Sequence, residues 1–384
     1  MKRSSRYCHD CGCRDIHVFA EYASLGRVTS DCKPWPAGGS LQVCRSCGLI
    51  QANTDDKWIA ECSEIYASYE SNYQSAGVDQ AIFDPLTGAA IQRSEKLLLE
   101  LLRRKLLPTT GSLVDIGCGS GGFLRACSMH LPDWDLFGLE SAATYEREVR
   151  SIRGVRNFFP FGLDKLTGLY HLVTLLHVFE HLPGPSAAYR VLERSLEQAG
   201  AIFIEVPSCE VNPFELLVVD HASHFTADQM VRMMQAMGAP LLHGSDCDWI
   251  PKEISLLAGR TEQDTRLRRS PAEIESIVGL VRRQIVWLES VADGAKRLAD
   301  DGRNFGVFGT SIAANWVTGV VGPEAIDFYV DEDPGRLGRS HFGKPIIAPA
   351  QVRSKDKVYV PLAPVVASAV TERLLASGVQ LVLP

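Results

Sequence analysis

The fold of this chain is decided by Val114-Asp115-Ile116-Gly117-Cys118-Gly119-Ser120-Gly121-Gly122-Phe123. This stretch ends a short apolar strand and leads into a helical segment, and its alternating glycines remove Cβ atoms at the turn between them. Main-chain N–H groups can therefore approach a ligand closely. A second apolar run, 136–139, ends in Glu140, whose carboxylate suits the two hydroxyls of a ribose. The pattern predicts a nucleotide-cofactor site in an α/β domain.

The acidic residue of this turn, Asp115, precedes the first glycine in the pattern D-x-G-x-G-x-G-G. The turn resembles motif I of class I S-adenosylmethionine-dependent methyltransferases, and it matches the G-x-G-x-x-G pattern of NAD sites less well. The resemblance implies that the glycines flank the methionine part of S-adenosylmethionine and that Glu140 holds its ribose. A tight turn in an unrelated α/β protein is the alternative. The expected cofactor-binding residues are Asp115, Gly117, Gly119, Gly121, Glu140 and His177.

Composition limits the class of protein. The chain has 384 residues, 46% hydrophobic and 22% charged, which is enough to bury the cores of two or three domains. No apolar run approaches about 18 residues, and the N-terminal segment leads to cysteines rather than to an apolar signal segment, so we expect a cytoplasmic protein without a membrane span. A formal net charge of −7 argues against a nucleic-acid partner, which would need clustered Lys and Arg.

Two Cys-x-x-Cys knuckles lie near the N-terminus. In a reducing compartment such pairs favour a metal over disulfides, and four thiolates suit a closed, tetrahedral Zn²⁺ site. We therefore expect residues 1–60 to form a module folded around structural zinc. The expected ligands are Cys8, Cys11, Cys44 and Cys47. Because the gap between the knuckles exceeds the commonest ribbon spacing, alternative ligands remain, namely Cys13, Cys32 and His9.

A tyrosine-rich segment, 61–87, follows this module. Tyr66, Tyr69 and Tyr73 are spaced three and four residues apart, so a helix would place them on one face. Such a stripe can pack against the next domain, or its phenols can line a substrate pocket.

Residues 88–262 are expected to form the cofactor-binding core. Apolar strands at 172–176 and 201–206 flank an amphipathic helix at 187–196, and this alternation predicts a doubly wound, Rossmann-like α/β fold with a parallel sheet. The capping pair Ser270 and Glu273 starts a connecting helix within 263–303. Residues 304–384 read as a second, smaller Rossmann-like domain, whose turn at 309–311 either holds a phosphate or is an ordinary strand-to-helix turn.

Histidines gather in segments that follow the core strands. The carboxyl ends of parallel strands meet at one edge of a sheet, so 177–181, 205–208 and 220–226 should converge on the ligand crevice. A neutral imidazole there can take a proton from a substrate. The alternative for each histidine is a core residue or a loop-fixing hydrogen bond, and we prefer it for His177 and His224.

The order of these modules resembles that of bacterial deoxysugar C-methyltransferases, which act on nucleotide-linked keto-sugars. In that family a histidine after the fourth strand, a Tyr-x-Glu-His group and a tyrosine before the core serve the site. Here Val218 stands in place of that tyrosine, Asp220 in place of the glutamate, and the usual downstream glycine-rich segment is absent. The resemblance implies the catalytic residues His221, Asp220 and His181. The implied substrate-binding residues are Tyr66, Tyr69, Tyr73, Glu205 and His224.

The resulting hypothesis is methyl transfer to a small polar acceptor. His221, oriented by Asp220, would remove a proton from a carbon next to a ketone or from a hydroxyl, and the nucleophile formed would attack the sulfonium methyl group. The expected partner is a nucleotide sugar, and the chain is expected to be a monomer or homodimer. Three alternatives remain: an O- or N-methyltransferase of small molecules, a zinc-containing RNA methyltransferase, and a non-enzymatic binding protein with a degenerate fold.

Overall fold

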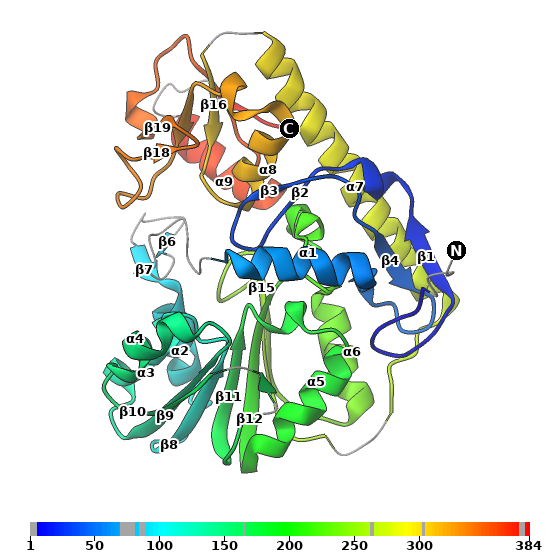
Figure 1. Ribbon diagram of the computed structural model, residues 1–384, viewed down its shortest axis with the longest axis vertical. Helices are drawn as coiled ribbons and strands as arrows, with labels where there is room; N and C mark the ends of the chain where they lie inside the picture. Colours follow the sequence, from blue (N-terminus) through cyan, green and yellow to red (C-terminus); the bar gives the residue numbers. More distant parts are fainter. Residues whose placement is uncertain are drawn as a thin grey trace.

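The computed structural model describes residues 6–69, 81–83, 90–160, 162–163, 166–261, 265–301, 304–375 and 381–384. Two α/β units lie at opposite ends of its long axis, and helix α7 (Pro271–Asp300) and the N-terminal strands run along the side that joins them (Figure 1). Tyr73, an expected substrate-binding residue, lies outside the described residues.

A seven-stranded sheet forms the larger unit, with the strand order β10-β9-β8-β11-β12-β15-β14. Its strands are β8 (Gly111–Ile116), β9 (Trp134–Glu140), β10 (Val155–Pro160), β11 (Tyr170–Leu176), β12 (Leu196–Pro207), β14 (Leu241–Asp246) and β15 (Glu253–Ala258). The order reverses between β8 and β11, which makes the carboxyl ends of these strands the switch point where ligands bind. The α/β fold is confirmed.

The prediction of a wholly parallel sheet is wrong at one edge. Strands β8 to β12 run parallel, but β15 is antiparallel to both of its neighbours. The reason is the short connection between β14 and β15, residues 247–252, which can join only antiparallel neighbours as a hairpin.

Helices cover both faces of this sheet. Along β12, Ile202 and Ile204 belong to one buried cluster and Phe203 to the other, as the period of two in a strand requires. Figure 1 shows α2, α3 and α4 against one face and α5 and α6 against the other. Their bounds are α2 (Arg93–Arg103), α3 (Gly122–His130), α4 (Glu146–Arg150), α5 (Pro185–Leu192) and α6 (Ala227–Met237).

The N-terminal segment builds a small antiparallel sheet onto the core. Its order is β1-β4-β5-β13, and β13 (Ser223–His224) comes from the core, where His224 pairs with Ile50. The segment that carries the expected site histidines is thus hydrogen-bonded to the cysteine module. The other elements are β1 (Ile16–Phe19), β2 (Arg27–Val28), β3 (Pro34–Trp35), β4 (Leu41–Cys44), β5 (Ile50–Ala52), α1 (Asp56–Ala67), β6 (Ala81–Phe83) and β7 (Ala90–Gln92).

The C-terminal unit follows α7, which starts with the predicted capping box of Ser270 and Glu273. A six-stranded sheet of order β18-β19-β17-β16-β20-β21 again reverses its order beside its first strand, β16. Its elements are β16 (Phe305–Phe308), α8 (Ile312–Val321), β17 (Phe328–Val330), β18 (Ser340–His341), β19 (Lys344–Ile347), β20 (Lys357–Tyr359), α9 (Pro364–Leu375) and β21 (Leu381–Val382). Across the described residues, every helix is too short or too polar to traverse a bilayer.

Candidate active site

One cavity of about 630 Å³ opens at the switch point of the larger sheet. Its lining includes the glycine turn, Glu140 and the segment 176–178 from the core. The N-terminal module contributes the turn 30–32, and the C-terminal unit contributes 311–313, Arg336 and 362–363. Three segments that are far apart in the sequence therefore enclose one space.

The glycine turn has the backbone that its sequence predicts. Gly117, Gly119 and Gly121 have φ of 68°, 50° and 88°, a region that favours glycine. A Cβ on Gly117 would lie 2.4 Å from a methyl carbon of Val178, so the turn admits no side chain there. Glu140 ends β9 beside this turn, where one carboxylate oxygen accepts hydrogen bonds from the Gly119 amide at 3.0 Å. The turn and Glu140 form the cradle expected for a nucleoside cofactor.

Asp115 lies below this cradle and is 3% exposed. Its carboxyl accepts a hydrogen bond of 2.7 Å from the hydroxyl of Thr174, which ties β8 to β11. Burial raises the pKa of Asp115 to about 7. The residue lines the cavity and also holds the two switch-point strands together.

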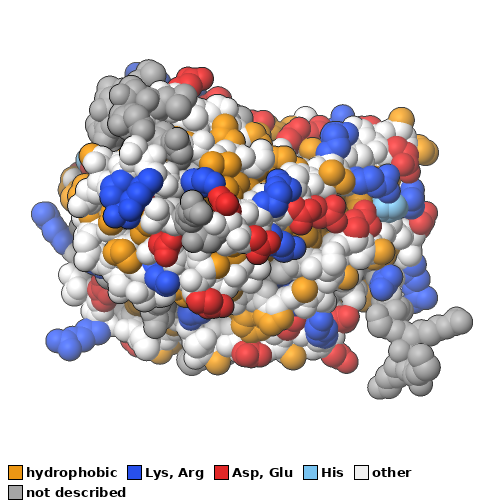
Figure 2. Space-filling view, turned by 90° about the horizontal axis from the view of Figure 1, so that it is seen from above, with side chains coloured by type: hydrophobic (Ala, Val, Ile, Leu, Met, Phe, Trp, Pro, Cys, Tyr) orange, Lys and Arg blue, Asp and Glu red, His pale blue; other side chains and the backbone are white. Residues whose placement is uncertain are grey.

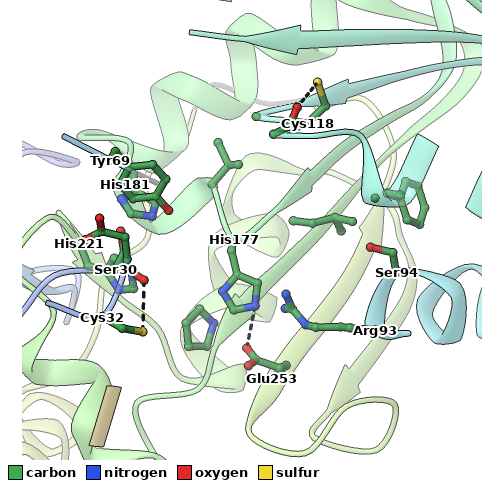
Figure 3. A pocket seen from close by; sticks show the side chains of 18 of the residues that line it. Ser30, Cys32, Tyr69, Arg93, Ser94, Cys118, His177, His181, His221 and Glu253 are labelled. Atoms are coloured by element: carbon green, nitrogen blue, oxygen red, sulfur yellow. Dashed lines mark hydrogen bonds and ion pairs between the residues drawn. The ribbon is translucent and has the colours of Figure 1, made fainter. Parts of the chain in front are cut away.

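His177 is a cavity residue with an uncommon backbone. Its φ is 56°, and its ring nitrogens lie 3.3 Å from a Glu180 oxygen and 3.5 Å from a Glu253 oxygen (Figure 3). Burial, followed by the nearby Arg93, holds the pKa of His177 well below its usual value. The imidazole is therefore neutral at pH 7.

Glu205 differs from its predicted role as a substrate-binding residue. Its side chain is fully buried at the end of β12, and the guanidinium of Arg93 lies 2.9 Å from one of its oxygens. Among the described residues, Arg93 rather than Glu205 lines the cavity. A carboxylate at this depth requires a cationic partner, and the sequence carried no local signal that the start of α2 supplies it.

His181 contacts Tyr66 and Asp220, two of the residues that the sequence analysis assigned to the site. Its Nδ1 lies 3.0 Å from the hydroxyl of Tyr66, 3.0 Å from the main-chain oxygen of Asp220 and 3.4 Å from an Asp220 carboxylate oxygen. The amide and hydroxyl of Ser30 donate hydrogen bonds of 2.9 and 2.5 Å to the two oxygens of that carboxylate. Tyr66 and Tyr69 both line the cavity, as one of the two readings of the tyrosine stripe requires.

His221 is held by a carboxyl that the sequence analysis missed. Its Nδ1 lies 2.6 Å from Oε1 of Glu215, whereas Asp220 contacts Ser30 and His181. The expectation that Asp220 orients His221 is therefore corrected, because the chain turns at residues 219–220 and the two side chains meet different partners. Burial lowers the pKa of both His181 and His221 to about 4. Two neutral imidazoles, each beside a carboxyl group, thus face the cavity (Figure 3).

His224 and Val218 lie behind this wall. The Nδ1 of His224 is 3.2 Å from the same Glu215 oxygen, and both residues line a second cavity of about 80 Å³ rather than the large one. The predicted substrate contact of His224 is thus replaced by a buried contact to Glu215. Position 218, where the resembling family has tyrosine, faces away from the acceptor space.

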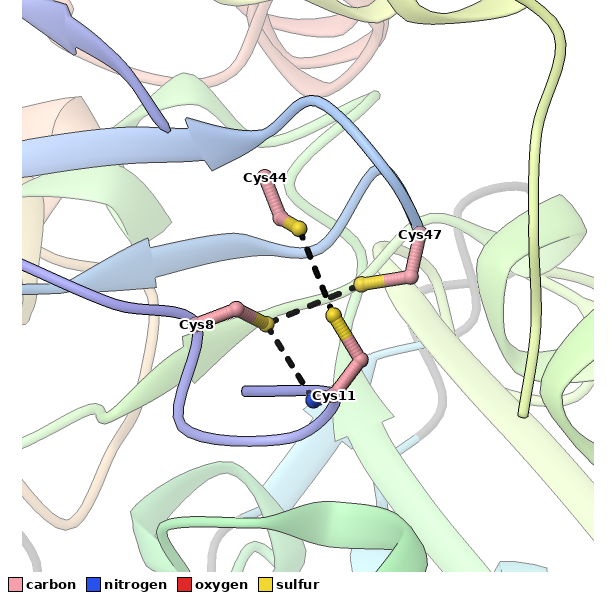
Figure 4. Close-up of side chains that lie close together, drawn as sticks. All are labelled: Cys8, Cys11, Cys44 and Cys47. Atoms are coloured by element: carbon pink, nitrogen blue, oxygen red, sulfur yellow. Dashed lines mark hydrogen bonds between the residues drawn. The ribbon is translucent and has the colours of Figure 1, made fainter. Parts of the chain in front are cut away.

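The four cysteine sulfurs converge at the base of the N-terminal module (Figure 4). The Sγ atoms of Cys8 and Cys47 are 3.7 Å apart and those of Cys11 and Cys44 are 3.5 Å apart. Tetrahedral zinc with Zn–S bonds of about 2.3 Å separates its sulfurs by roughly 3.8 Å, so the donor set fits. Of the alternative ligands, Cys32 lines the large cavity instead.

Residues 89–243 match the family model described as a methyltransferase domain. This segment is similar to methyltransferase domains. It contains the glycine turn, Glu140 and the three histidines of the cavity, His177, His181 and His221. The prediction of an enzyme of the methyltransferase class is confirmed. S-adenosylmethionine as methyl donor agrees with this domain and with the cradle formed by the turn and Glu140.

Solved structures similar to the chain include methyltransferases. Coclaurine N-methyltransferase bound to N-methylheliamine and SAH is 12% identical, with a TM-score of 0.38 over 50% of this chain and 66% of that one. A S-adenosylmethionine-dependent methyltransferase from Clostridium acetobutylicum is 10% identical, with a TM-score of 0.36 over 53% of this chain and 98% of that one. No curated protein matches the sequence.

Proposed function

We propose that the chain transfers a methyl group from S-adenosylmethionine to a carbon of a nucleotide-linked keto-deoxysugar. The observation that carries the proposal is the pair of neutral, carboxyl-backed histidines that face the same cavity as the cofactor cradle. Methylation of carbon requires removal of a proton from the position next to a ketone, and a neutral imidazole is the side chain suited to take it near pH 7.

The cradle fits the expected cofactor. Backbone at Gly117 and Gly119 leaves room for a ligand against the main chain, and Glu140 is placed for its ribose hydroxyls. S-adenosylmethionine supplies an electrophilic methyl group on a positively charged sulfur. The surrounding protein orients the acceptor and excludes water, because charge disappears rather than builds up as the methyl group moves.

Acid–base catalysis is assigned to the histidines and the tyrosine of the cavity. His221, with its Nδ1 held by Glu215, accepts the acceptor's proton at Nε2. The phenol of Tyr66, fixed 3.0 Å from His181, is placed to donate a hydrogen bond to the oxygen of the enolate. Asp220 and Ser30 keep His181 in place for that contact.

The C-terminal wall supports a nucleotide-linked acceptor. The N-terminal end of α8 at Ser311 and the guanidinium of Arg336 both line the cavity. A helix N-terminus attracts phosphate oxygens, so a diphosphate extending from the sugar would meet the first turn of α8, whereas Arg336 already pairs with Asp331 and Asp333, each at 3.2 Å.

A second candidate is methylation of oxygen or nitrogen on another small molecule. The valine at position 218 enters this choice only through the sequence resemblance, because its side chain lines the second cavity. An RNA acceptor is disfavoured: Figure 2 shows Lys and Arg side chains interspersed with Asp and Glu over the face in view, and the whole chain carries a net charge of −7.

The remaining expectations complete the proposal. Structural Zn²⁺ at the four cysteines would anchor the N-terminal module, and a chain with these reduced thiols would work in the cytoplasm as a monomer or homodimer. The units would be 1–60 for zinc, 61–87 for the tyrosine segment, 88–262 for the donor-binding core, 263–303 for the connecting helix and 304–384 for the second Rossmann-like domain.

The test is product analysis with isotope-labelled S-adenosylmethionine and a panel of nucleotide sugars. Label on a ring carbon of a keto-deoxysugar supports the proposal, and loss of that product in His221→Gln assigns the base. Label found only on oxygen or nitrogen selects the second candidate. Label transferred to RNA but to no nucleotide sugar would overturn both.

A further inference from the structure

A row of three buried side chains connects the active-site cavity with the second cavity. His221 lines the first, and His224 lines the second. A single oxygen of Glu215, Oε1, lies 2.6 Å from Nδ1 of His221 and 3.2 Å from Nδ1 of His224. The row is therefore continuous at hydrogen-bond distances between two separate spaces.

Burial determines how protons are distributed along this row. His221 is 3% exposed, and Glu215 and His224 are each 2% exposed. Charged groups at such depth lose their hydration, and burial accordingly raises the pKa of Glu215 and lowers the pKa of both histidines. In an all-neutral arrangement, a protonated Oε1 can accept one hydrogen bond from His221 and donate another to His224.

The second cavity offers a way out to water. It is small, about 80 Å³, but polar and charged side chains line it, among them Arg27, Asp55 and Glu61. Lys57, whose side chain is 60% exposed, and Gly38, which is also exposed, lie at its rim. A proton delivered to His224 can thus reach solvent without passing through the space that holds the acceptor.

We propose that Glu215 and His224 form a relay that carries the proton removed by His221 to the second cavity. This inference rests on the proposed function, because it gives a path to the proton that methylation releases. The acceptor's proton goes to Nε2 of His221, the Nδ1 proton of His221 goes to Oε1 of Glu215, and the proton already on Oε1 goes to Nδ1 of His224. The Nε2 proton of His224 then leaves to water, and each group ends neutral.

The same three side chains have the composition of a divalent-metal site. Their spacing argues for hydrogen bonds, because two ligands that are each about 2.1 Å from one ion lie roughly 3 Å or more apart, whereas the shorter contact here is 2.6 Å. A metal would also remove His221 from proton transfer. Metal binding is therefore an outcome of the test that contradicts the relay.

Tautomer states measured by nitrogen-15 NMR on histidine-labelled protein test the relay without any acceptor. The expected result at pH 7 is a proton on Nδ1 of His221 and on Nε2 of His224, with a downfield proton bridging each ring to Glu215. In Glu215→Gln both bridging signals should disappear. Protons on Nδ1 of both rings, or shifts typical of metal-bound nitrogen after addition of Zn²⁺ beyond one equivalent, would overturn the relay.

Turnover provides the functional arm, with a thymidine-diphosphate-linked 4-keto-6-deoxyhexose as the acceptor probe. His224→Phe should lower kcat at least tenfold with little change in KM. His130→Gln, at the end of α3, is the matched control and should behave as the native protein. Full activity of His224→Phe would rule out the relay.

A variant that fills the second cavity tests whether protons leave through it without removing any relay residue. Val218 lines the second cavity, so Val218→Phe fills that space while all three relay residues remain. We expect an unchanged thermal midpoint within a few degrees, a reduced kcat and a larger solvent isotope effect. If no nucleotide sugar is methylated at all, the proposed function fails, and the NMR result still decides whether the row is arranged for proton transfer.

Discussion

The hydroxyl of Ser30 lies 2.5 Å from a carboxylate oxygen of Asp220, although 190 positions separate the two residues in the chain. The Ser30 amide donates to the other oxygen of the same carboxylate at 2.9 Å. This pair of bonds fixes the side chain that faces Nδ1 of His181. The N-terminal module therefore lines the candidate active site as well as packing against the core.

Replacing Ser30 by Ala should lower turnover while donor binding stays intact. The variant removes one of the two hydrogen bonds that hold the Asp220 carboxyl group beside His181, and a hydrogen bond of this kind is worth about 1–3 kcal/mol. We expect kcat to fall at least tenfold and the Kd for S-adenosylmethionine, from calorimetry, to stay within about twofold. Ser63→Ala on the exposed face of α1 is the control. Equal losses in both variants would remove Ser30 from the site.

Replacing Gly117 by Ala should abolish donor binding. The new Cβ would lie 2.4 Å from Val178, and the positive φ of 68° adds strain of about 1–2 kcal/mol. Calorimetry with S-adenosylhomocysteine should show the loss. Gly279→Ala within α7 is the control, because it meets only the far end of Arg283 at 3.4 Å and should stabilise the helix by about 1 kcal/mol. If Gly117→Ala bound S-adenosylhomocysteine with native affinity, the glycine turn would not be the donor-binding site.

Zinc removal should unfold the N-terminal module and reduce turnover together. Cys8 and Cys44 are buried, and the metal would join the two knuckles of the module, whose Phe19, Val28 and Val43 also pack in the buried cluster around α7. Elemental analysis should give one zinc per chain in the native protein and in Cys13→Ser, and none in Cys44→Ser. A protein that keeps its activity and thermal midpoint after complete chelation would show that the metal is dispensable.

Acidification should destabilise the protein through His221 and His181. Their folded pKa is about 4 and their unfolded pKa about 6.5, so between these values the unfolded chain binds more protons and stability falls as pH falls. Each pKa unit corresponds to about 1.4 kcal/mol. Asp115, with its pKa raised to about 7, acts in the opposite direction, because its stabilising contribution is lost as pH rises toward 7.

Comparison with His221→Gln isolates the histidine contribution in that window. Urea unfolding at pH 7 and at pH 5 should show a smaller loss of stability in the variant than in the native protein. His130→Gln serves as the control and should keep the native slope. An unchanged slope in His221→Gln would mean that His221 is protonated in the folded protein.

Local patterns predicted the parts of the site that depend on neighbouring residues. The glycine turn, Glu140 and the four cysteines each follow from spacing along a short segment, because backbone conformation and knuckle geometry are set within a few positions. The capping box at the start of α7 belongs to the same class.

Contacts between site residues that are distant in the sequence could not be predicted, for a physical reason. Glu215 lies in a short 3-10 helix, Pro213–Leu217, which the sequence analysis did not predict, so nothing marked it as the partner of His221. Ser30 reaches the cavity from the N-terminal module and Arg93 from the start of α2, and only the packed fold brings them there. Adjacency suggested Asp220 for His221, whereas the chain directs these neighbours to different partners.

Three units share the large cavity, so substitutions that affect the donor cradle and substitutions that affect the opposite wall fall in different parts of the chain. The glycine turn and Glu140 belong to the core, whereas the wall at Ser311 and Arg336 belongs to the C-terminal unit. Substitutions in that wall can redirect which molecule is modified without disturbing the donor cradle. Divergence of acceptor choice in such a protein would therefore be recorded first in its last eighty or so positions, while the donor turn stays constant.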